Sequence, residues 1–362
     1  MLGRLAGKKI FTKAIYPQLA KALQEANRLR LLSADIMITG QPDGNSWRGV
    51  YNGAIAFFPD KVLTIPQVYS TPVFDEKKIE TLCFHLINSG FEKIIFSGYT
   101  RQYKPFFIAL ANAKKKLNSD AKIFLIHHSS FTSNREDAGV IPTLKEILEL
   151  HQKGFIHHIG FIKKGMSETF EVVAGIKSSH LIPMTKKIPD KVFEKTHAYP
   201  GLNIGVFTGN HYRKNIDNQV AAALMFPEST VHVHSHNQFD YLFNNERITE
   251  HPFSEDYDAF LSLIGSMSVN FYVTLSECFG LFITESLSVG VPCLGALNSG
   301  LFDYDEELKS FLVVEEFDNS AAIFKQAEIV VAHREMLSSR GKEYVEKLNQ
   351  IAGDKFAAFL NS

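Results

Sequence analysis

The chain of 362 residues is long enough for two domains of common size. Hydrophobic residues make up 45% of it and charged residues 21%, a balance that indicates a globular protein and excludes a disordered or membrane-embedded one. With 38 basic and 39 acidic residues the formal net charge is −1, so no overall field attracts nucleic acid.

The cysteines and the apolar runs indicate the compartment in which the protein works. Cys83, Cys278 and Cys293 are odd in number and lack the close pairs of a zinc site or redox motif, which is typical of a reducing compartment. No apolar run reaches the roughly 20 residues that span a bilayer, and the N-terminus lacks the apolar core of a signal peptide. We therefore expect a cytoplasmic protein.

Residues 1–30 form a basic amphipathic stretch in which Glu25 is the only acid. Two interpretations stay open: peripheral contact with the inner, anionic face of a membrane, or a solvated helix face that packs on the domain. The basic residues are Arg4, Lys8, Lys9, Lys13, Lys21, Arg28 and Arg30.

The first half of the chain alternates short apolar runs with amphipathic ones. Fully apolar strands separated by helices predict a parallel sheet covered on both faces, because an exposed face would show alternation. The expected elements are strands 93–97 and 122–127 and helices 104–117 and 143–153. Ahead of them, residues 40–44 and 51–72 are interpreted as turns and irregular strands.

Residues 182–200 contain three prolines, Lys186 and Lys187, and no periodicity, which is typical of an interdomain linker. We place the boundary near residue 190, with domains at 1–188 and 189–340 and a C-terminal helix at 341–362. The alternation then restarts and predicts a second doubly wound sheet, so the fold class is α/β with two Rossmann-like domains. Its expected strands are 202–208, 230–234, 269–274, 293–296 and 311–315, and its helices are 216–225, 254–266, 282–289 and 338–360.

The segment after strand 269–274 carries the strongest functional pattern, since ligands of such sheets bind at the carboxyl ends of the strands. The backbone N–H groups of Phe279, Gly280 and Leu281 fall at a helix N-terminus, which favours a phosphate. Gly280 allows close approach of the ligand to the backbone. Glu277 in the turn and Glu285 in the first turn of the helix suit hydrogen bonds to sugar hydroxyls at two places.

A second candidate anion site follows strand 202–208. Residues 208–215 open a helix that Asn215 is expected to cap, and Arg213 and Lys214 would reach the same edge of the sheet. Taken singly, these cations could be a surface pair, Glu285 a dipole-favoured acid and Glu277 a solvated loop residue. Their joint position after two strands of one sheet favours a single nucleotide-sugar site.

At this point the sequence resembles a known family. Residues 276–294, SECFGLFITESLSVGVPCL, resemble the signature of retaining glycosyltransferase family 4, in which seven residues separate two glutamates, and the likeness extends over residues 200–320. The resemblance implies the glycosyltransferase-B fold, with two Rossmann-like domains facing a central cleft and an acceptor-binding N-terminal domain. The family usually has an arginine directly after the glycine that corresponds to Gly209, where this chain has Asn210 in a loop shorter by one residue.

The resemblance also implies roles for individual residues. Glu285 would hold the ribose and Glu277 the transferred sugar. Lys214, assisted by Arg213, would bind the diphosphate in the loop that begins at Gly209. Backbone amides of residues 279–281 would contact sugar and phosphate. Pro252 and Phe253 stand where such enzymes receive the nucleobase.

Two histidine patterns carry weaker hypotheses. His128 or His127 ends strand 122–127 and could orient the acceptor or the transferred sugar, or could be satisfied structurally. The run from His232 through His234 to His236 has the spacing of a zinc chelate, but no carboxylate or cysteine stands in register. We expect no metal and no cofactor beyond the donor substrate.

The function that these features favour is sugar transfer from a nucleotide diphosphate sugar to a glycan or lipid-linked acceptor, as in bacterial cell-surface polysaccharide synthesis. The resemblance implies retention of configuration through a front-face step, with Lys214, Arg213 and the helix N-terminus stabilising the departing diphosphate in place of a metal. Two alternatives stay open. One is a nucleotide-sugar epimerase of the same architecture, and the other is a non-catalytic nucleotide-binding partner in a polysaccharide assembly complex.

Overall fold

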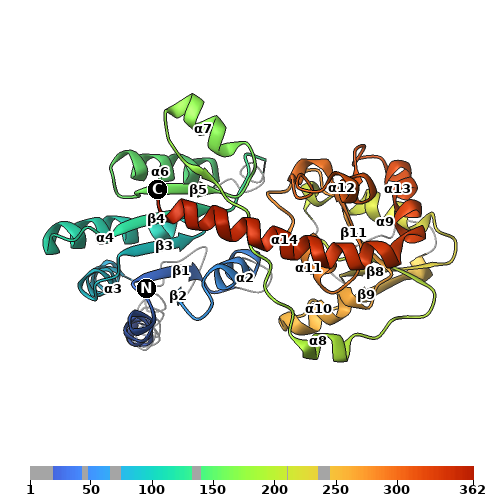
Figure 1. Cartoon of the computed structure of the whole chain (residues 1–362), viewed down its shortest axis with the longest axis horizontal. Helices are drawn as coiled ribbons and strands as arrows, with labels where there is room; N and C mark the ends of the chain where they lie inside the picture. Colours follow the sequence, from blue (N-terminus) through green and yellow to red (C-terminus); the bar gives the residue numbers. More distant parts are fainter. Residues whose placement is uncertain (1–18, 43–47, 66–74, 133–139, 210, 235–244) are drawn as a thin grey trace, which may run out of the picture. The chain divides into compact units, whose positions relative to one another are not determined.

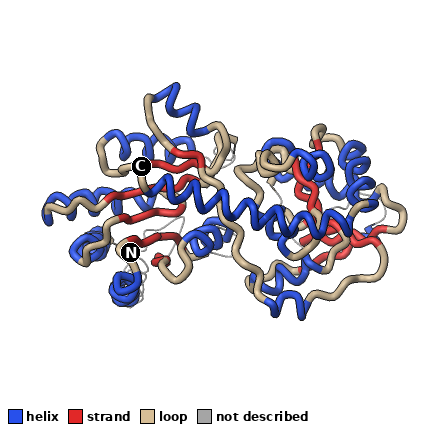
Figure 2. The backbone as a smooth tube through the Cα atoms, viewed as in Figure 1, coloured by secondary structure: helices blue, strands red, loops and turns tan. Residues whose placement is uncertain are grey.

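The computed structural model describes residues 19–42, 48–65, 75–132, 140–209, 211–234 and 245–362. The chain divides into two compact units: unit 1 comprises Met1–Leu181 together with Lys355–Ser362, and unit 2 comprises Ile182–Asp354. Figure 2 shows a strand layer flanked by helices in each unit. The division falls a few residues before the boundary expected near residue 190, and the last residues of the chain belong to unit 1.

Unit 1 is built on a six-stranded sheet with the order β2-β1-β3-β4-β5-β6, and every strand pair is parallel. Its strands are β1 (Asp35–Gly40), β2 (Val62–Ile65), β3 (Lys93–Ser97), β4 (Lys122–His127), β5 (His158–Phe161) and β6 (Ser179–His180). Its helices are residues 19–32, α2 (Arg48–Phe57), α3 (Glu76–Asn88), η1 (Arg101–Tyr103), α4 (Lys104–Leu117), α6 (Val140–Gln152) and α7 (Met166–Ala174).

The two faces of this sheet have separate apolar cores, because successive strand residues point to opposite faces. Buried residues of helix 19–32, α3, α4 and α6 cover one face, where Phe96 of β3 meets Phe107 of α4 with ring centroids 4.5 Å apart. On the other face, Phe124 of β4 contacts Phe359, which lies near the C-terminus, at 5.1 Å. Phe356 stacks on Phe57 of α2 at 4.5 Å.

The interpretation of residues 51–72 as irregular strands was wrong in part. Residues 51–57 belong to α2, and the strand β1 before it was not predicted. Helix α2 contains Gly49, Tyr51, Asn52 and Gly53, which are weak helix formers, so its local sequence does not announce a helix. Packing on β1 stabilises it instead.

Unit 2 also has a six-stranded, fully parallel sheet, with the order β12-β11-β10-β7-β8-β9. Its strands are β7 (Leu202–Val206), β8 (Ser229–His234), β9 (Ile248–His251), β10 (Val269–Tyr272), β11 (Cys293–Ala296) and β12 (Val313–Val314). Its helices are α8 (Asp190–Lys195), η2 (Tyr212–Lys214), α9 (Ile216–Leu224), η3 (Asn245–Arg247), α10 (Tyr257–Gly265), α11 (Leu281–Ser288), η4 (Leu297–Ser299), α12 (Glu306–Leu312), α13 (Ser320–Ala332) and most of α14 (Arg334–Leu360).

Three expectations for this half need correction. The linker contains the short helix α8, which Pro189 precedes as N-cap residue. Residues 311–312 end helix α12, and only Val313 and Val314 pair as a strand. Helix α14 begins at Arg334, four residues before the expected start at residue 338, and runs as one helix of 27 residues.

Strand order fixes where a ligand site is expected in each unit. Numbered within unit 2, the order from β9 to β12 is 3-2-1-4-5-6, the Rossmann order, and the direction of winding reverses between β7 and β10. In unit 1 the reversal falls between β1 and β3. The prediction of an α/β fold with two Rossmann-like parallel sheets is confirmed.

Most of the basic N-terminal stretch lies outside the described residues. Of its described cations, Arg28 pairs with Glu25 at 2.7 Å, and the Arg30 Nε donates to the Ser89 carbonyl at 2.9 Å. Within the described residues, no helix is both long and apolar enough to cross a membrane.

Candidate functional site

The loops that follow β7 and β10 are joined at the point where the sheet of unit 2 reverses. The backbone N–H of Leu275 donates to the Arg213 carbonyl at 2.8 Å. The fully buried Gln219 of α9 joins the loops again, because its amide donates to the Lys214 carbonyl at 2.7 Å and accepts from the Val273 N–H at 2.8 Å. The two segments predicted from the sequence therefore form one structural element.

The Asn215 side chain has a different hydrogen-bond partner from the one expected. It occupies the N-cap position of α9 with φ at 54°, but its side chain makes no capping hydrogen bond. Its amide instead donates to the Val273 carbonyl at 3.0 Å, across to the β10 loop. The expected N-cap position is confirmed, but the side chain makes no capping hydrogen bond because it bridges the two loops.

These loops bring Glu277 together with two cations. Lys214 Nζ lies 2.5 Å and Arg213 Nη1 3.5 Å from the Glu277 Oε2 atom. The Tyr272 hydroxyl donates to the same oxygen at 2.8 Å and accepts a hydrogen bond from Lys214. Lys214 Nζ also stands 4.6 Å from the centroid of the Tyr272 ring, a cation–π distance. We call Arg213, Lys214, Tyr272 and Glu277 the charged cluster.

The charged cluster sets the protonation of its members. Burial alone would raise the pKa of Glu277, but the charges of Lys214 and Arg213 and the hydrogen bonds to its carboxylate outweigh burial and lower the pKa to about 2. Burial, with the charge of Arg213, lowers the pKa of Lys214. Burial and the Glu277 charge raise the pKa of Tyr272 well above its usual range. The carboxylate is therefore ionised and the phenol neutral at physiological pH.

Helix α11 begins beside the charged cluster. Gly280 is its N-cap residue with φ at 94°, a backbone conformation that favours glycine. Since α11 starts at Leu281, the first N–H groups of the helix have no partner within it and can receive an anion. Phe279 is buried, and Leu281 is partly exposed. The backbone groups predicted to bind phosphate thus lie at the start of this helix, and their role stays a prediction.

Glu285 lies one residue further along the helix than the sequence suggested. It is the fifth residue of α11 and not in the first turn, because the helix starts at Leu281. Its side chain is buried, and its Oε1 atom accepts a hydrogen bond from the Tyr257 hydroxyl at 2.7 Å. The alternative of a dipole-favoured first-turn acid is therefore excluded.

The structure gives less information on Gly209 and Asn210, in the loop after β7. Gly209 is described, and among the described residues a Cβ added there would meet His211 Cδ2 at 3.4 Å, an ordinary contact. Asn210, where the family pattern has arginine, lies outside the described residues.

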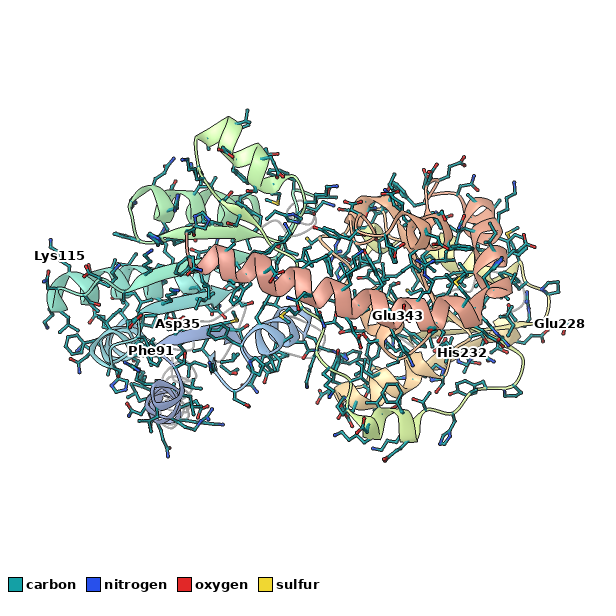
Figure 3. All side chains as sticks on the ribbon, in the orientation of Figure 1. Asp35, Phe91, Lys115, Glu228, His232 and Glu343 are labelled. Atoms are coloured by element: carbon teal, nitrogen blue, oxygen red, sulfur yellow. The ribbon has the colours of Figure 1, made fainter. Side chains whose placement is uncertain are left out.

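The segment predicted to receive a nucleobase follows β9. Phe253 meets the ring of His234, the last residue of β8, with centroids 5.8 Å apart, while Pro252 is exposed. His232, labelled in Figure 3, shares a hydrogen bond of 2.8 Å with His251 and one of 2.9 Å with Asn203. Both ring nitrogens of His232 are therefore engaged in hydrogen bonds to protein side chains.

The described residues contain no group of three or more histidine, cysteine or acidic residues that could hold a metal ion. His236, the third member of the suspected chelate, lies outside them.

In unit 1, His128 stands at the carboxyl end of β4. Its Nε2 atom lies 3.1 Å from the Ser97 hydroxyl at the end of β3, and the Thr39 hydroxyl of β1 donates to the Ser97 carbonyl at 3.3 Å. Burial, and then the charge of neighbouring His127, lower the pKa of His128 to about 3, so its imidazole is neutral. His127 instead faces the core, edge-on to Phe161 at 5.8 Å. We call Thr39, Ser97 and His128 the neutral cluster.

Sequence reasoning did not find Tyr272, Tyr257, Gln219 or Ser97. Tyr272 and Ser97 end their strands, and a search of strand ends for hydroxyl groups would have found both. A glutamine within the apolar run of α9 was a signal for Gln219. Nothing near Tyr257 in the sequence points to Glu285, because their contact joins two helices.

Comparisons with known proteins address the fold. No family model and no curated protein matches the sequence. Among solved structures, a sucrose-phosphate synthase from Thermosynechococcus elongatus matches 90% of this chain over 99% of its own, at 12% identity and a TM-score of 0.57. A UDP-forming α,α-trehalose-phosphate synthase from Burkholderia xenovorans, in complex with glucose-6-phosphate, matches 90% of this chain over 99% of its own, at 10% identity and a TM-score of 0.63.

A trehalose-6-phosphate protein from E. coli, bound with UDP-2-fluoro glucose, matches 90% of this chain over 98% of its own, at 10% identity and a TM-score of 0.60. At such identities the likeness is one of fold alone. The glycosyltransferase-B fold predicted from residues 276–294 is therefore confirmed, and membership of family 4 stays a prediction. The chain has the fold of the trehalose- and sucrose-phosphate synthases.

Proposed function

We propose that this protein is a retaining glycosyltransferase that moves a sugar from a nucleotide diphosphate sugar to a hydroxyl acceptor. The observation that carries the proposal is the charged cluster beside the start of α11, at the strand reversal of a Rossmann sheet. Two cations and a helix N-terminus there suit a diphosphate. Solved structures of the same fold include a UDP-forming synthase and a protein bound with UDP-2-fluoro glucose, which supports a nucleotide-sugar donor.

The charged cluster also suggests how a donor would engage. Glu277 pairs with both Lys214 and Arg213, so one negative charge faces two positive ones. An entering diphosphate would replace Glu277 as their counterion, and the carboxylate would then be available to accept hydrogen bonds from sugar hydroxyls. Exchange of one anion for another keeps both cations paired, which avoids the cost of leaving a buried charge uncompensated.

In the proposed reaction, an acceptor hydroxyl oxygen forms a bond to the anomeric carbon on the face from which the diphosphate departs. The bond from that carbon to the diphosphate oxygen breaks, and the diphosphate takes the hydroxyl proton. Lys214, Arg213 and the first N–H groups of α11 stabilise the negative charge on the leaving group. We propose that these groups take the place of a metal ion.

The acceptor is the finer part of the proposal. The resemblance of residues 276–294 to family 4 supports a glycan or lipid-linked acceptor in cell-surface polysaccharide synthesis, with the basic N-terminal stretch near the membrane. The Burkholderia synthase of the same fold binds glucose-6-phosphate, so sugar phosphates belong in any acceptor panel. The neutral cluster of unit 1 supports a role for His128 in hydrogen bonding to acceptor or sugar hydroxyls.

A donor screen tests the proposal. The protein is incubated, with EDTA and without acceptor, with UDP-glucose, UDP-galactose, UDP-N-acetylglucosamine, ADP-glucose and GDP-mannose, and release of the nucleoside diphosphate is measured. We expect slow hydrolysis of at least one donor and a loss of roughly 10²–10³-fold in Glu277→Ala. Glu228→Ala is the matched control, because Glu228 is an exposed glutamate of unit 2, labelled in Figure 3.

Three outcomes would contradict transfer. Formation of an epimerised nucleotide sugar, detected by NMR, would identify an epimerase. Binding of a donor without turnover, with Glu277→Ala indistinguishable from the wild-type protein, would identify a non-catalytic partner. Failure of every donor to bind or hydrolyse would overturn the nucleotide-sugar site itself.

A further inference from the structure

Tyr257 links two helices of unit 2 through one hydrogen bond to a buried carboxylate. It is the first residue of α10, and its hydroxyl donates to the Oε1 atom of Glu285 in α11 at 2.7 Å. Asp256 caps α10, its side chain accepting from the Asp258 N–H at 2.9 Å, so the helix start that carries the tyrosine is fixed. The phenol therefore holds one oxygen of Glu285 in a defined direction.

The hydrogen-bond donor to Glu285 determines which ligand groups this carboxylate can bind. A neutral phenol that donates to a carboxylate orients it but leaves its negative charge in place. Glu277, by contrast, faces two cations. Glu285 thus has a hydroxyl as a partner, and a carboxylate that accepts from one hydroxyl suits a ligand that offers further hydroxyl donors.

Tyr257, which donates to this carboxylate, lies in the segment that follows β9. Phe253, four residues before Tyr257, packs edge-on against His234 at the end of β8. The Lys186 ammonium lies 5.6 Å from the centroid of the Tyr257 ring. A cation over the ring draws electron density from it and favours donation by the hydroxyl. The same short segment therefore carries the predicted base contact and the group that orients Glu285.

We propose that Tyr257 is a positioning residue that sets the Glu285 carboxylate for the ribose diol of a nucleoside diphosphate, and that it thereby makes the site select ribonucleotides over 2′-deoxyribonucleotides. The proposal rests on the proposed function, because it takes the ligand of α11 to be a nucleotide. Two neighbouring hydroxyls bind a carboxylate well only when its plane is fixed. Loss of the tyrosine hydroxyl removes the hydrogen bond that orients the Oε1 atom of this carboxylate.

The test compares ribose with deoxyribose in one binding experiment. Dissociation constants of UDP, ADP and GDP are measured by calorimetry, and the tightest binder is compared with its 2′-deoxy form. We expect the wild-type protein to prefer the ribonucleotide by roughly tenfold, the effect of one hydrogen bond to a charged group. Tyr257→Phe should weaken ribonucleotide binding by about fivefold and leave deoxyribonucleotide binding nearly unchanged.

Two further variants make the result specific. Tyr344→Phe removes a hydroxyl that donates to the Leu301 carbonyl elsewhere in unit 2, so it should lower thermal stability without changing the preference for ribose. Glu285→Gln should abolish the preference, and adding Tyr257→Phe to it should change nothing more, because both residues act on the same hydroxyls.

The outcomes separate the two claims. Equal weakening of ribo- and deoxyribonucleotide binding in Tyr257→Phe would overturn the positioning role and leave a structural one. An unchanged preference in that variant would overturn it as well. If none of the three diphosphates binds the wild-type protein, the proposed function fails first.

Discussion

The polar groups at the point where the strand order reverses differ between the two sheets: they are charged in unit 2 and neutral in unit 1. In unit 2 the loops at β7 and β10 hold the charged cluster, with two cations and a carboxylate within 3.5 Å. In unit 1 the ends of β1, β3 and β4 hold the neutral cluster, in which burial keeps His128 uncharged. The same position in the sheet thus holds charged side chains in unit 2 and neutral, hydrogen-bonding side chains in unit 1.

The difference matches the chemistry of the two proposed substrates. A diphosphate carries charge and becomes more negative as its bond to the sugar breaks, so cations and helix N-terminal amides stabilise it. An alcohol carries no charge, and a cation beside it would only add a cost of desolvation. Substitutions in the charged cluster should therefore affect the departure of the diphosphate, and those in the neutral cluster the use of the acceptor.

The largest effect is expected for Lys214→Met, which keeps the length of the side chain but removes its charge. Lys214 is the cation nearest to Glu277, at 2.5 Å, and the proposed contact of the leaving diphosphate. We expect kcat for transfer and for donor hydrolysis to fall together by roughly 10²–10³-fold. Lys325→Met, at an exposed position of α13, is the control for loss of a lysine charge. Rates within twofold of the wild-type values would refute the role of Lys214.

A smaller and more selective effect is expected for His128→Ala. It removes the partner of Ser97, so transfer to an acceptor should fall by about tenfold while donor hydrolysis is less affected. Ser97→Ala should act in the same direction, and His333→Ala, at an exposed position of unit 2, should leave both rates unchanged.

The pH profile of the wild-type protein extends this test. Since the pKa of His128 is lowered to about 3, this residue gains a proton only in strong acid. The ratio of transfer to hydrolysis should therefore be flat between about pH 5 and pH 8, although an ordinary histidine titrates in that range. A step near pH 6.5 that disappears in His128→Ala would show that the imidazole is charged in the working enzyme.

The smallest effect is expected for Gly280→Ala, which adds a methyl group at the start of α11. The backbone there has φ at 94°, and the added Cβ would lie 3.3 Å from Ile283 Cδ1. Strain of about 1–3 kcal/mol should lower the melting temperature by several degrees. Gly209→Ala, where the added Cβ makes one ordinary contact and φ is not positive, should melt within about a degree of the wild-type protein. Equal melting of the two variants would contradict the strain at residue 280.

The sequence predicted the elements whose pattern is local. Strands 93–97 and 122–127 and helix 104–117 agree with the structure to the residue, because their apolar runs end at clear turn or cap residues. β1 and α2 were not predicted, since α2 contains two glycines and depends on packing against the sheet. Residues 313–314 pair as a strand only because β11 lies beside them.

In the candidate site, too, some features could be predicted from the sequence and others could not. The two loops could be placed from the sequence, because both follow strands of one parallel sheet and their ends meet at one edge. The pairing of Glu277 with Lys214 joins residues 63 positions apart, and no periodicity encodes such a contact. The hydrogen bond of the Asn215 side chain was not predicted for the same reason, since its partner Val273 follows β10 and lies 58 positions away in the sequence.

Helix α14 has a consequence for the order in which the protein can fold. The residues after Asp354 belong to unit 1, where Phe359 is fully buried against Phe124 and Phe356 stacks on Phe57. During synthesis the N-terminal half leaves the ribosome first, yet one face of its sheet lacks these aromatic rings until residues 355–362 have been translated. One apolar face of the unit 1 sheet is therefore completed only after the whole of unit 2 has been translated.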